Sequence, residues 1–241
     1  MDGIELAARF SYITNSLRFC GPREASHQFL KYISNKKNPK GVQESLKRFE
    51  GLYPYLSAIA EKFGKGFSDF DVVEAYWIGN KLLEKFNEDD LKDIIRNLML
   101  RGLPKSFGMN LIRNLPQGLV PHHNFNVFYV GVGKTTGSVE TTLQNMENCM
   151  VSYGKVVQVL GDKLIVAAQA LREENKQIRL VDGVAKTAVF LPEMIGPVRN
   201  GDIVALHWGF APMVLNDFQV SNLIKFSTLT LKSVNKQRSI T

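Results

Sequence analysis

Thiol and imidazole side chains have the clearest chemical potential in this 241-residue sequence, because both bind transition metals and both take part in nucleophilic catalysis. They are Cys20, Cys149, His27, His122, His123 and His207. No Cys-x-x-Cys and no His-x-x-x-His spacing occurs among them, so a structural zinc site is not expected. Two cysteines are also too few to hold a chain of this length together, so the fold must depend on its core.

Cys149 stands at an expected hinge of the chain. It closes a predicted helix over residues 139–148, and the sequence Gly154-Lys155-Val156 then opens a predicted strand. A thiol at such a hinge is held in place yet reachable by solvent, as a metal-binding or nucleophilic thiolate requires. The alternative is that Cys149 is a small buried hydrophobic residue. Both interpretations stay open at this point.

The remaining candidates also have two interpretations each. His207 lies in the apolar run 203–208 and is either a ligand or a half-buried strand residue bonded to its neighbour. His122 and His123 precede an aromatic segment, and adjacent residues of a regular strand point to opposite faces, so both could not bind one metal from it. Cys20 precedes a Gly-Pro turn and is either exposed as a second thiol or buried at a helix end. If it approached Cys149, the two thiols could hold iron jointly or form a redox pair.

Residues 131–136, Gly-Val-Gly-Lys-Thr-Thr, resemble part of a phosphate-binding loop between an expected strand and an expected helix. Lys134 would then reach the terminal phosphates and Thr135 a magnesium ion. The full motif needs a further glycine five residues before Gly133, however, and that position holds Phe128. A flexible strand-to-helix connection is therefore the preferred interpretation.

The elements that must position these side chains change in kind along the chain. Up to about residue 115 the apolar spacing is helical, and it predicts helices over residues 68–86 and 87–98. The aromatic and β-branched stretch at residues 124–130 predicts a strand. Further short strands are expected at residues 155–160, 163–168, 178–181, 188–191 and 203–208.

Turn sequences separate these expected strands, and Asp182-Gly183 is one of them. Five short strands within about 60 residues predict a small closed or nearly closed barrel. A last amphipathic helix is expected from residue 217 to about 226. The predicted fold class is therefore α+β, with an N-terminal all-α helical domain, a small OB-like β-barrel and a C-terminal helix.

Composition restricts the class of protein. Apolar residues make up 44% and charged residues 22%, which is ordinary for a globular chain. No apolar run is long enough to span a membrane and the N-terminus lacks a secretion signal, so a soluble cytoplasmic protein is expected. The net charge of +7 is spread evenly over the two halves, with +4 in residues 1–120 and +3 in residues 121–241. Nucleic acid is therefore not an expected partner.

Two motifs of the second half resemble the HypC/HupF hydrogenase-maturation chaperones. Residues 148–156, Asn-Cys-Met-Val-Ser-Tyr-Gly-Lys-Val, are similar to the family's opening, where a Cys is followed five residues later by Gly-Lys-Val. Residues 201–211, Gly-Asp-Ile-Val-Ala-Leu-His-Trp-Gly-Phe-Ala, are similar to its second motif, a Gly-Asp turn, an apolar strand, then His and Gly-Phe-Ala. The resemblance covers residues 148–224. In that family the Cys stands at the mature N-terminus, whereas here 148 residues precede it.

The resemblance implies a non-catalytic accessory protein that assembles a nickel–iron centre. It implies Cys149 as a ligand of a transient iron that carries cyanide and carbon monoxide. It also implies His207 as a second ligand or as the hydrogen-bond partner of the thiolate. The implied partner is a maturation scaffold protein or a hydrogenase large-subunit precursor. The implied domains are residues 1–120 (helical), 121–150 (a strand-loop-helix connection) and 151–241 (a HypC-like barrel).

The N-terminal part resembles a family of uncharacterised prokaryotic proteins, which has a helical module before the barrel. The sequences that carry this resemblance are Ala8-Arg9-Phe10-Ser11-Tyr12, Phe19-Cys20-Gly21-Pro22, Tyr53-Pro54-Tyr55-Leu56, Val73–Asn80 and Pro121-His122-His123. Two other function classes remain as alternatives. One is an enzyme with Cys149 as nucleophile and a histidine as base. The other is a metal-free barrel that binds protein or nucleic acid.

Overall fold

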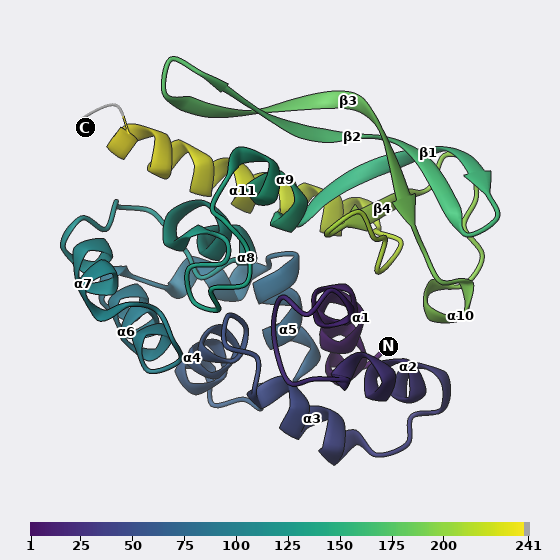
Figure 1. Ribbon diagram of the computed structural model, residues 1–241, viewed down its shortest axis with the longest axis horizontal. Coiled ribbons are helices and arrows are strands. Elements are labelled where there is room, and N and C mark those ends of the chain that lie inside the picture. Colours follow the sequence, from purple (N-terminus) through teal and green to yellow (C-terminus); the bar gives the residue numbers. More distant parts are fainter. Residues whose placement is uncertain (239–241) are drawn as a thin grey trace.

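Helices and a sheet form two layers, with the C-terminal helix between them (Figure 1). The computed structural model describes residues 1–238. The first layer contains α1 (Gly3–Ser16), α2 (Ala25–Asn35), α3 (Pro39–Lys47), α4 (Tyr53–Phe63), α5 (Phe70–Trp77), the 3-10 helix η1 (Lys81–Lys85), α6 (Glu88–Met99) and α7 (Lys105–Arg113). The rest contains α8 (His123–Phe125), the π-helix η2 (Asn126–Gly131), α9 (Leu143–Cys149), β1 (Ser152–Leu160), β2 (Lys163–Glu174), β3 (Gln177–Val189), α10 (Pro192–Ile195), β4 (Ile203–Leu206) and α11 (Asp217–Arg238).

The helix predicted over residues 87–98 is confirmed as α6. Asn87 and Asp90 form a reciprocal capping box at its N-terminus, and acidic residues fill its first turn. Leu91, Ile94, Ile95 and Leu98 are fully buried against the helical layer. Local sequence signals and the tertiary environment agree here, so both the type and the boundaries of the element could be predicted.

The helix predicted over residues 68–86 is interrupted in the structure. It forms α5, which ends at Trp77, and a separate 3-10 helix, η1. Gly79 has a positive φ of 94° and a Cβ at this position would lie 2.1 Å from the Phe226 ring of α11. Only glycine combines this backbone conformation with so close an approach. The break fixes Trp77 at the end of α5, where it faces the site described below.

The strand predicted over residues 124–130 is wrong, because this segment is helical. It comprises α8 and the π-helix η2. Nearly all of its residues are buried, so it shows no polar face that would reveal a helical period. A short run that is apolar on all sides does not distinguish a buried helix from a buried strand.

The predicted barrel is also wrong, because the four strands form an open antiparallel sheet in the order β3-β2-β1-β4. β1 pairs with both β2 and β4, whereas β3 pairs only with β2. A single isolated bridge, from Val189 to Phe210, connects the end of β3 to the segment after β4. The two edge strands therefore do not close the sheet.

The strands predicted at residues 178–181 and 188–191 are not separate, since residues 177–189 form the single long strand β3. Asp182-Gly183 lies at an irregularity in its pairing with β2, where the register changes between Ala168 and Ala170. The positive φ of Gly183, 76°, is compatible with a bulge as well as with a hairpin turn. The dipeptide signal was therefore real, but it marks a bulge in a continuous strand.

The C-terminal helix α11 extends at least twelve residues beyond its predicted end, over Asp217–Arg238 of the described chain. It contacts β1 and β3 on one side and α8 and η2 on the other. One continuous apolar core joins residues of the helical layer, the sheet and α11. Strands and helices that are far apart in the sequence thus pack around α11.

None of the helices within residues 1–238 is both long enough and apolar enough to cross a membrane.

Candidate metal centre

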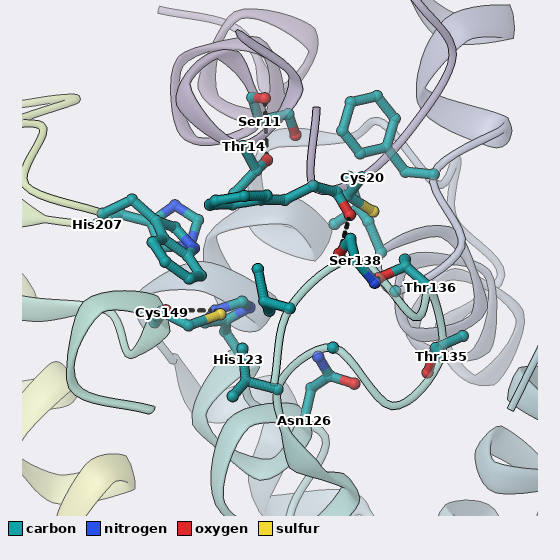
Figure 2. A pocket seen from close by; sticks show the side chains of 18 of the residues that line it. Ser11, Thr14, Cys20, His123, Asn126, Thr135, Thr136, Ser138, Cys149 and His207 are labelled. Atoms are coloured by element: carbon teal, nitrogen blue, oxygen red, sulfur yellow. Dashed lines mark hydrogen bonds between the residues drawn. The ribbon is translucent and has the colours of Figure 1, made fainter. Parts of the chain in front are cut away.

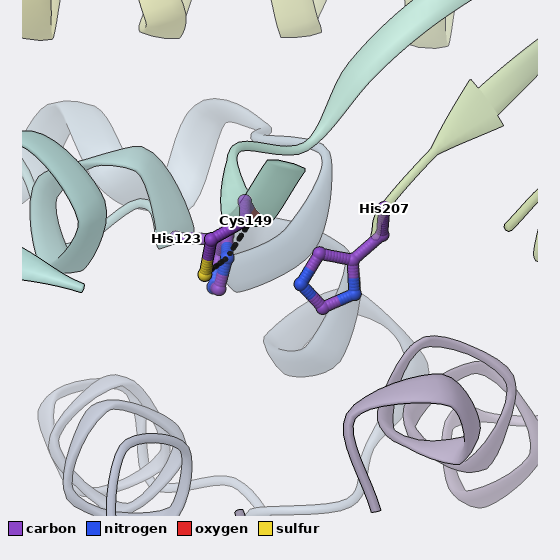
Figure 3. Close-up of side chains that lie close together, drawn as sticks. All are labelled: His123, Cys149 and His207. Atoms are coloured by element: carbon purple, nitrogen blue, oxygen red, sulfur yellow. Dashed lines mark hydrogen bonds between the residues drawn. The ribbon is translucent and has the colours of Figure 1, made fainter. Parts of the chain in front are cut away.

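His123, Cys149 and His207 lie together in the interior, although they are distant in the sequence (Figure 3). One ligand atom from each residue lies within 4.8 Å of the other two. Cys149 Sγ is 3.8 Å from His123 Nε2. The three side chains are almost inaccessible to solvent, with exposed fractions of 4%, 8% and 1% respectively. This buried group could hold a metal ion.

The pairing of β1 with β4 brings Cys149 and His207 to the same end of the sheet. Ser152, at the start of β1, is opposite Leu206, at the end of β4. Cys149 closes α9 three residues before this pair, and His207 follows it directly. Antiparallel pairing therefore places the two residues side by side, as the sequence analysis required of a shared site.

His207 is oriented by a tight two-residue turn. Trp208 and Gly209 both have positive φ values, 52° and 68°. The backbone N–H groups of His207 and Phe210 each donate to the other residue's carbonyl, at 2.9 and 3.0 Å. This is the hydrogen-bonding pattern of a type I′ hairpin, and a tryptophan in its left-handed first position costs about 1 kcal/mol or more. Such local strain is often found where a side chain must be held in one place.

The tautomer of His207 follows from its partners. Its Nδ1 lies 3.2 Å from the carbonyl oxygen of Phe10 in α1, and a carbonyl only accepts, so Nδ1 carries the proton and donates. Nε2 then bears the lone pair, and this buried atom has no hydrogen-bond partner. A backbone carbonyl behind one ring nitrogen, with the other nitrogen free, is the arrangement typical of a metal-binding histidine.

Both ring nitrogens of His123 have polar partners. The Tyr76 hydroxyl donates to the carbonyl of Gly51 at 2.9 Å, and its oxygen lies 3.0 Å from His123 Nδ1. Nε2 lies 2.9 Å from the carbonyl oxygen of Cys149. A neutral imidazole has one N–H, so either Nε2–H donates to the Cys149 carbonyl while Nδ1 accepts from Tyr76, or Nδ1–H donates to the Tyr76 oxygen and Nε2 keeps its lone pair. Only the second tautomer can bind a metal ion through Nε2.

Burial controls the protonation of all three residues. It lowers the pKa of His123 to about 4 and that of His207 well below its usual value, so both imidazoles are neutral at pH 7. It raises the pKa of the Cys149 thiol to about 12. The indole N–H of Trp208 opposes this shift by favouring the thiolate. Neutral imidazoles are ready to bind a metal, whereas the thiol must first lose its proton.

A cavity of about 70 Å³ lies beside the three residues (Figure 2). α1, the Cys20 turn and the loop at residues 131–139 form its other walls. In Figure 2, Cys149 and His207 lie on one side of the cavity, with Cys20 and the loop residues Thr135 and Ser138 on the opposite side. Among residues 1–238, no Asp, Glu, Lys or Arg side chain lines it.

Cys149 differs from its sequence-based interpretation in one respect. The hinge between α9 and β1 is where the sequence placed it, but the thiol is buried and is not reachable by solvent at the protein surface. The reason is that α9 packs on both β2 and η2 and so covers the hinge.

Cys20 lines the same cavity but does not join the three ligands. Its Sγ donates to the carboxylate of Glu50 at 3.4 Å, and the same oxygen accepts from the backbone N–H of Gly21. Burial, followed by the negative charge of Glu50, raises the pKa of the Cys20 thiol to about 12. Its own partner therefore holds it as a protonated thiol, away from Cys149.

His122 points away from the cavity, although it is adjacent to His123. Its Nδ1 accepts the backbone N–H of Asn124 at 3.1 Å and so caps α8, and its ring stacks on Phe226. The sequence analysis excluded a shared metal for the two residues on the basis of a strand. The strand is absent, yet the side chains still diverge because they occupy the first turn of a helix.

The phosphate-loop hypothesis loses its expected structural setting. Residues 131–136 follow the π-helix η2 and not a strand, and a turn rather than a helix comes next. Lys134 lies over the Phe107 ring, 5.6 Å from its centroid, and Thr135 is buried in the cavity wall. The backbone here forms part of the lining of the cavity.

Sequence reasoning missed the residues that support the site. Asn124 is fully buried and bonds both the N–H and the carbonyl of Val151, at 3.0 and 3.1 Å, and also Ser227, at 2.7 Å. It thereby fixes His123 relative to the chain that follows Cys149. Tyr76 was counted only as an apolar helix position, and the Phe10 carbonyl carries no sequence signal at all.

The comparisons with known proteins concern the whole chain. Residues 1–241 match a family described as "Family of unknown function (DUF6390)". The chain belongs to this family. No curated protein and no solved structure matches it significantly. Because the match covers residues 1–241, the helices and the sheet of this DUF6390 protein belong to the same family model. That model assigns no function, so the chemistry of the site follows from its geometry.

Proposed function

We propose that this DUF6390 protein binds one transition-metal ion through His123, Cys149 and His207. The observation that carries the proposal is the meeting of their ligand atoms within 4.8 Å of one another. Three separate segments supply the atoms, so no local motif accounts for the proximity. The lone pair on His207 Nε2, a buried atom without a hydrogen-bond partner, provides further support, since a cation would satisfy it.

The donor set indicates the class of metal. One thiolate and two imidazoles suit zinc, copper, cobalt or ferrous iron, whereas calcium and magnesium prefer oxygen ligands. Three protein ligands leave a fourth position open, as in metal sites that bind a further ligand and unlike closed structural sites. The adjacent cavity is where that position would lie.

The side chains must move slightly to reach bonding distance. Metal–nitrogen bonds of about 2.0–2.1 Å and metal–sulfur bonds of about 2.3 Å place tetrahedral ligand atoms roughly 3.3–3.7 Å apart. The 3.8 Å between Cys149 Sγ and His123 Nε2 already approaches this value, whereas the widest separation is up to 4.8 Å. The most widely separated pair of ligand atoms therefore closes by up to about 1 Å on binding.

The test is anaerobic titration with cobalt(II) and zinc(II), in the protein and in matched variants. Cys149→Ser and His207→Gln remove ligands and are expected to weaken binding by at least about 100-fold. Cys20→Ser removes the other thiol of the cavity, and His27→Gln removes an exposed imidazole; both controls are expected to retain full affinity. Equal affinity in Cys149→Ser and Cys20→Ser would contradict the proposal.

We further propose that the bound ion is iron and that the protein is a non-catalytic accessory protein of the hydrogenase-maturation type. The support is that the two motifs resembling that family lie on the paired strands β1 and β4 and bring Cys149 and His207 together. A soft thiolate suits low-spin ferrous iron with strong-field diatomic ligands. The partner would be a maturation scaffold protein or a hydrogenase large-subunit precursor, and transfer to it requires opening of a site that is buried here.

This narrower role has its own test. The protein is purified anaerobically together with hydrogenase-maturation partners and examined by infrared spectroscopy. Cyanide- and carbon-monoxide-type bands are expected in the wild type and in Cys20→Ser, and are expected to disappear in Cys149→Ser. Bands that persist in Cys149→Ser would count against iron carriage at this site. Stoichiometric cobalt binding would still support the metal centre itself.

The alternative of a nucleophilic cysteine finds no support in the geometry. A nucleophilic thiol needs a lowered pKa and access to a substrate. The pKa of Cys149 is instead raised to about 12 by burial, and the nearest imidazole nitrogen lies 3.8 Å away. In the absence of a metal ion, the thiol is therefore protonated at neutral pH.

A further inference from the structure

The cavity beside the three ligands contains hydrogen-bond donors that nothing in the protein satisfies. The indole Nε1 of Trp77 and the hydroxyl of Ser11 are both buried without a hydrogen-bond partner. Their residues are 3% and 1% exposed, and both line the cavity. A buried polar group without a partner costs about 1–3 kcal/mol, so donors of this kind point to a ligand that is bound here.

Trp77 lies directly against the ligands of the proposed metal. Its ring centroid is 4.6 Å from that of His123 and 5.3 Å from that of His207. Stacking on Phe10 at 4.9 Å holds the indole in place. A molecule that accepts a hydrogen bond from Trp77 would therefore lie next to the open coordination position. The indole Nε1 of Trp208, which also lines the cavity, is likewise buried without a hydrogen-bond partner.

The net charge of the metal-loaded site determines whether this molecule is an anion, a cation or neutral. A divalent ion with one thiolate and two neutral imidazoles has a net charge of +1, and no described residue with a charged side chain lines the cavity to balance it. A net charge buried without a partner is costly. A monoanion at the fourth coordination position would neutralise it and would accept hydrogen bonds more strongly than a neutral molecule.

The volume restricts the size of the anion. Each water-sized volume takes about 10–15 Å³ on this scale, so the cavity of about 70 Å³ holds about five to seven water-sized groups. We propose that the cavity binds a small monoanion of no more than about five to seven heavy atoms, which coordinates the metal and accepts hydrogen bonds from Trp77 and Ser11. This inference rests on the metal site proposed above.

The test uses the cobalt(II)-loaded protein and azide as the probe. Azide is expected to change the visible cobalt spectrum with saturation, whereas benzoate, which is too large for the cavity, is expected to leave the spectrum unchanged. Trp77→Phe keeps the ring but removes the N–H, and Ser11→Ala removes the hydroxyl. Each is expected to weaken azide binding by about 10-fold, since hydrogen bonds to charged groups are among the stronger ones.

Thr14→Val is the matched control. Thr14 also lines the cavity, but its hydroxyl already donates to the carbonyl of Ser11 at 3.1 Å, so azide affinity is expected to be unchanged. A cobalt spectrum that azide does not affect would overturn this inference alone, as would equal azide affinities in Trp77→Phe, Ser11→Ala and Thr14→Val. Failure of the protein to bind cobalt would overturn the metal site and the anion site together.

Discussion

The pH dependence of metal binding tests the electrostatics of the site, because each ligand makes a different contribution to it. Metal binding must remove the proton of the Cys149 thiol, whose pKa is raised to about 12 by burial. The affinity therefore rises about tenfold per pH unit throughout the neutral range, with release of one proton for each ion bound. Between about pH 5.5 and 8.5 this amounts to a gain of roughly 1,000-fold.

The histidines are expected to add almost nothing to this slope. Burial lowers the pKa of His123 from 6.5 to about 4, and it lowers that of His207 well below 6.5. Both imidazoles are then already neutral at about pH 5.5 and release no proton to the solvent. Two imidazoles of ordinary pKa would each add about tenfold over the same range, which would raise the total gain to roughly 100,000-fold.

Anaerobic competition between the protein and a chelator for cobalt(II), repeated across this pH range, measures the slope. An indicator dye in weakly buffered solution counts the protons released. Cys149→Ser provides the control, because a neutral serine hydroxyl leaves the affinity nearly independent of pH. A gain near 100,000-fold would refute the argument that burial keeps the imidazoles neutral, and no gain would show that the thiol is already ionised.

Three further predictions concern the groups around the ligands. His123 has a pKa near 6.5 in the unfolded chain but only about 4 in the folded protein. The free energy of unfolding of the metal-free protein should therefore fall by about 3 kcal/mol for this residue as the pH drops through this window. Urea denaturation at several pH values measures this change, and a free energy of unfolding that does not vary with pH would contradict the burial argument. Tyr76→Phe removes the hydroxyl that lies 3.0 Å from His123 Nδ1 and positions this ring, and should weaken cobalt binding by about 10- to 100-fold with little change of fold, as circular dichroism can verify. Asn124→Ala leaves the backbone N–H and carbonyl of Val151 without their partner, and it should reduce the free energy of unfolding by about 3 kcal/mol. A loss below about 0.5 kcal/mol would show that the hydrogen bonds of Asn124 do not stabilise the fold.

Elements of the fold could be predicted from the sequence where local signals and tertiary packing favour the same structure. The capping box of α6 and the hairpin of β1 and β2 have short-range signals, and they do not depend on how the rest of the chain packs. A shared site for Cys149 and His207 was expected only from the resemblance to the hydrogenase-maturation family, because the pairing of β1 with β4 joins segments far apart in the sequence.

The remainder depends on packing that no local pattern encodes. The segment at residues 124–130 is buried on all sides, so its apolar run did not distinguish a helix from a strand. This error also hid the role of His123, since the third ligand reaches the site only from a helix start. The bulge at Gly183 was mistaken for a turn, which divided β3 in two and suggested a closed barrel.

The most direct test of the metal centre is X-ray absorption spectroscopy of the cobalt- or zinc-loaded protein. The first coordination shell is expected to contain one sulfur at about 2.3 Å and two imidazole nitrogens at about 2.0–2.1 Å. The sulfur contribution should vanish in Cys149→Ser and remain in Cys20→Ser. A shell of nitrogen and oxygen alone in the wild-type protein, or a sulfur contribution that survives Cys149→Ser, would contradict the assignment of His123, Cys149 and His207 as the ligands.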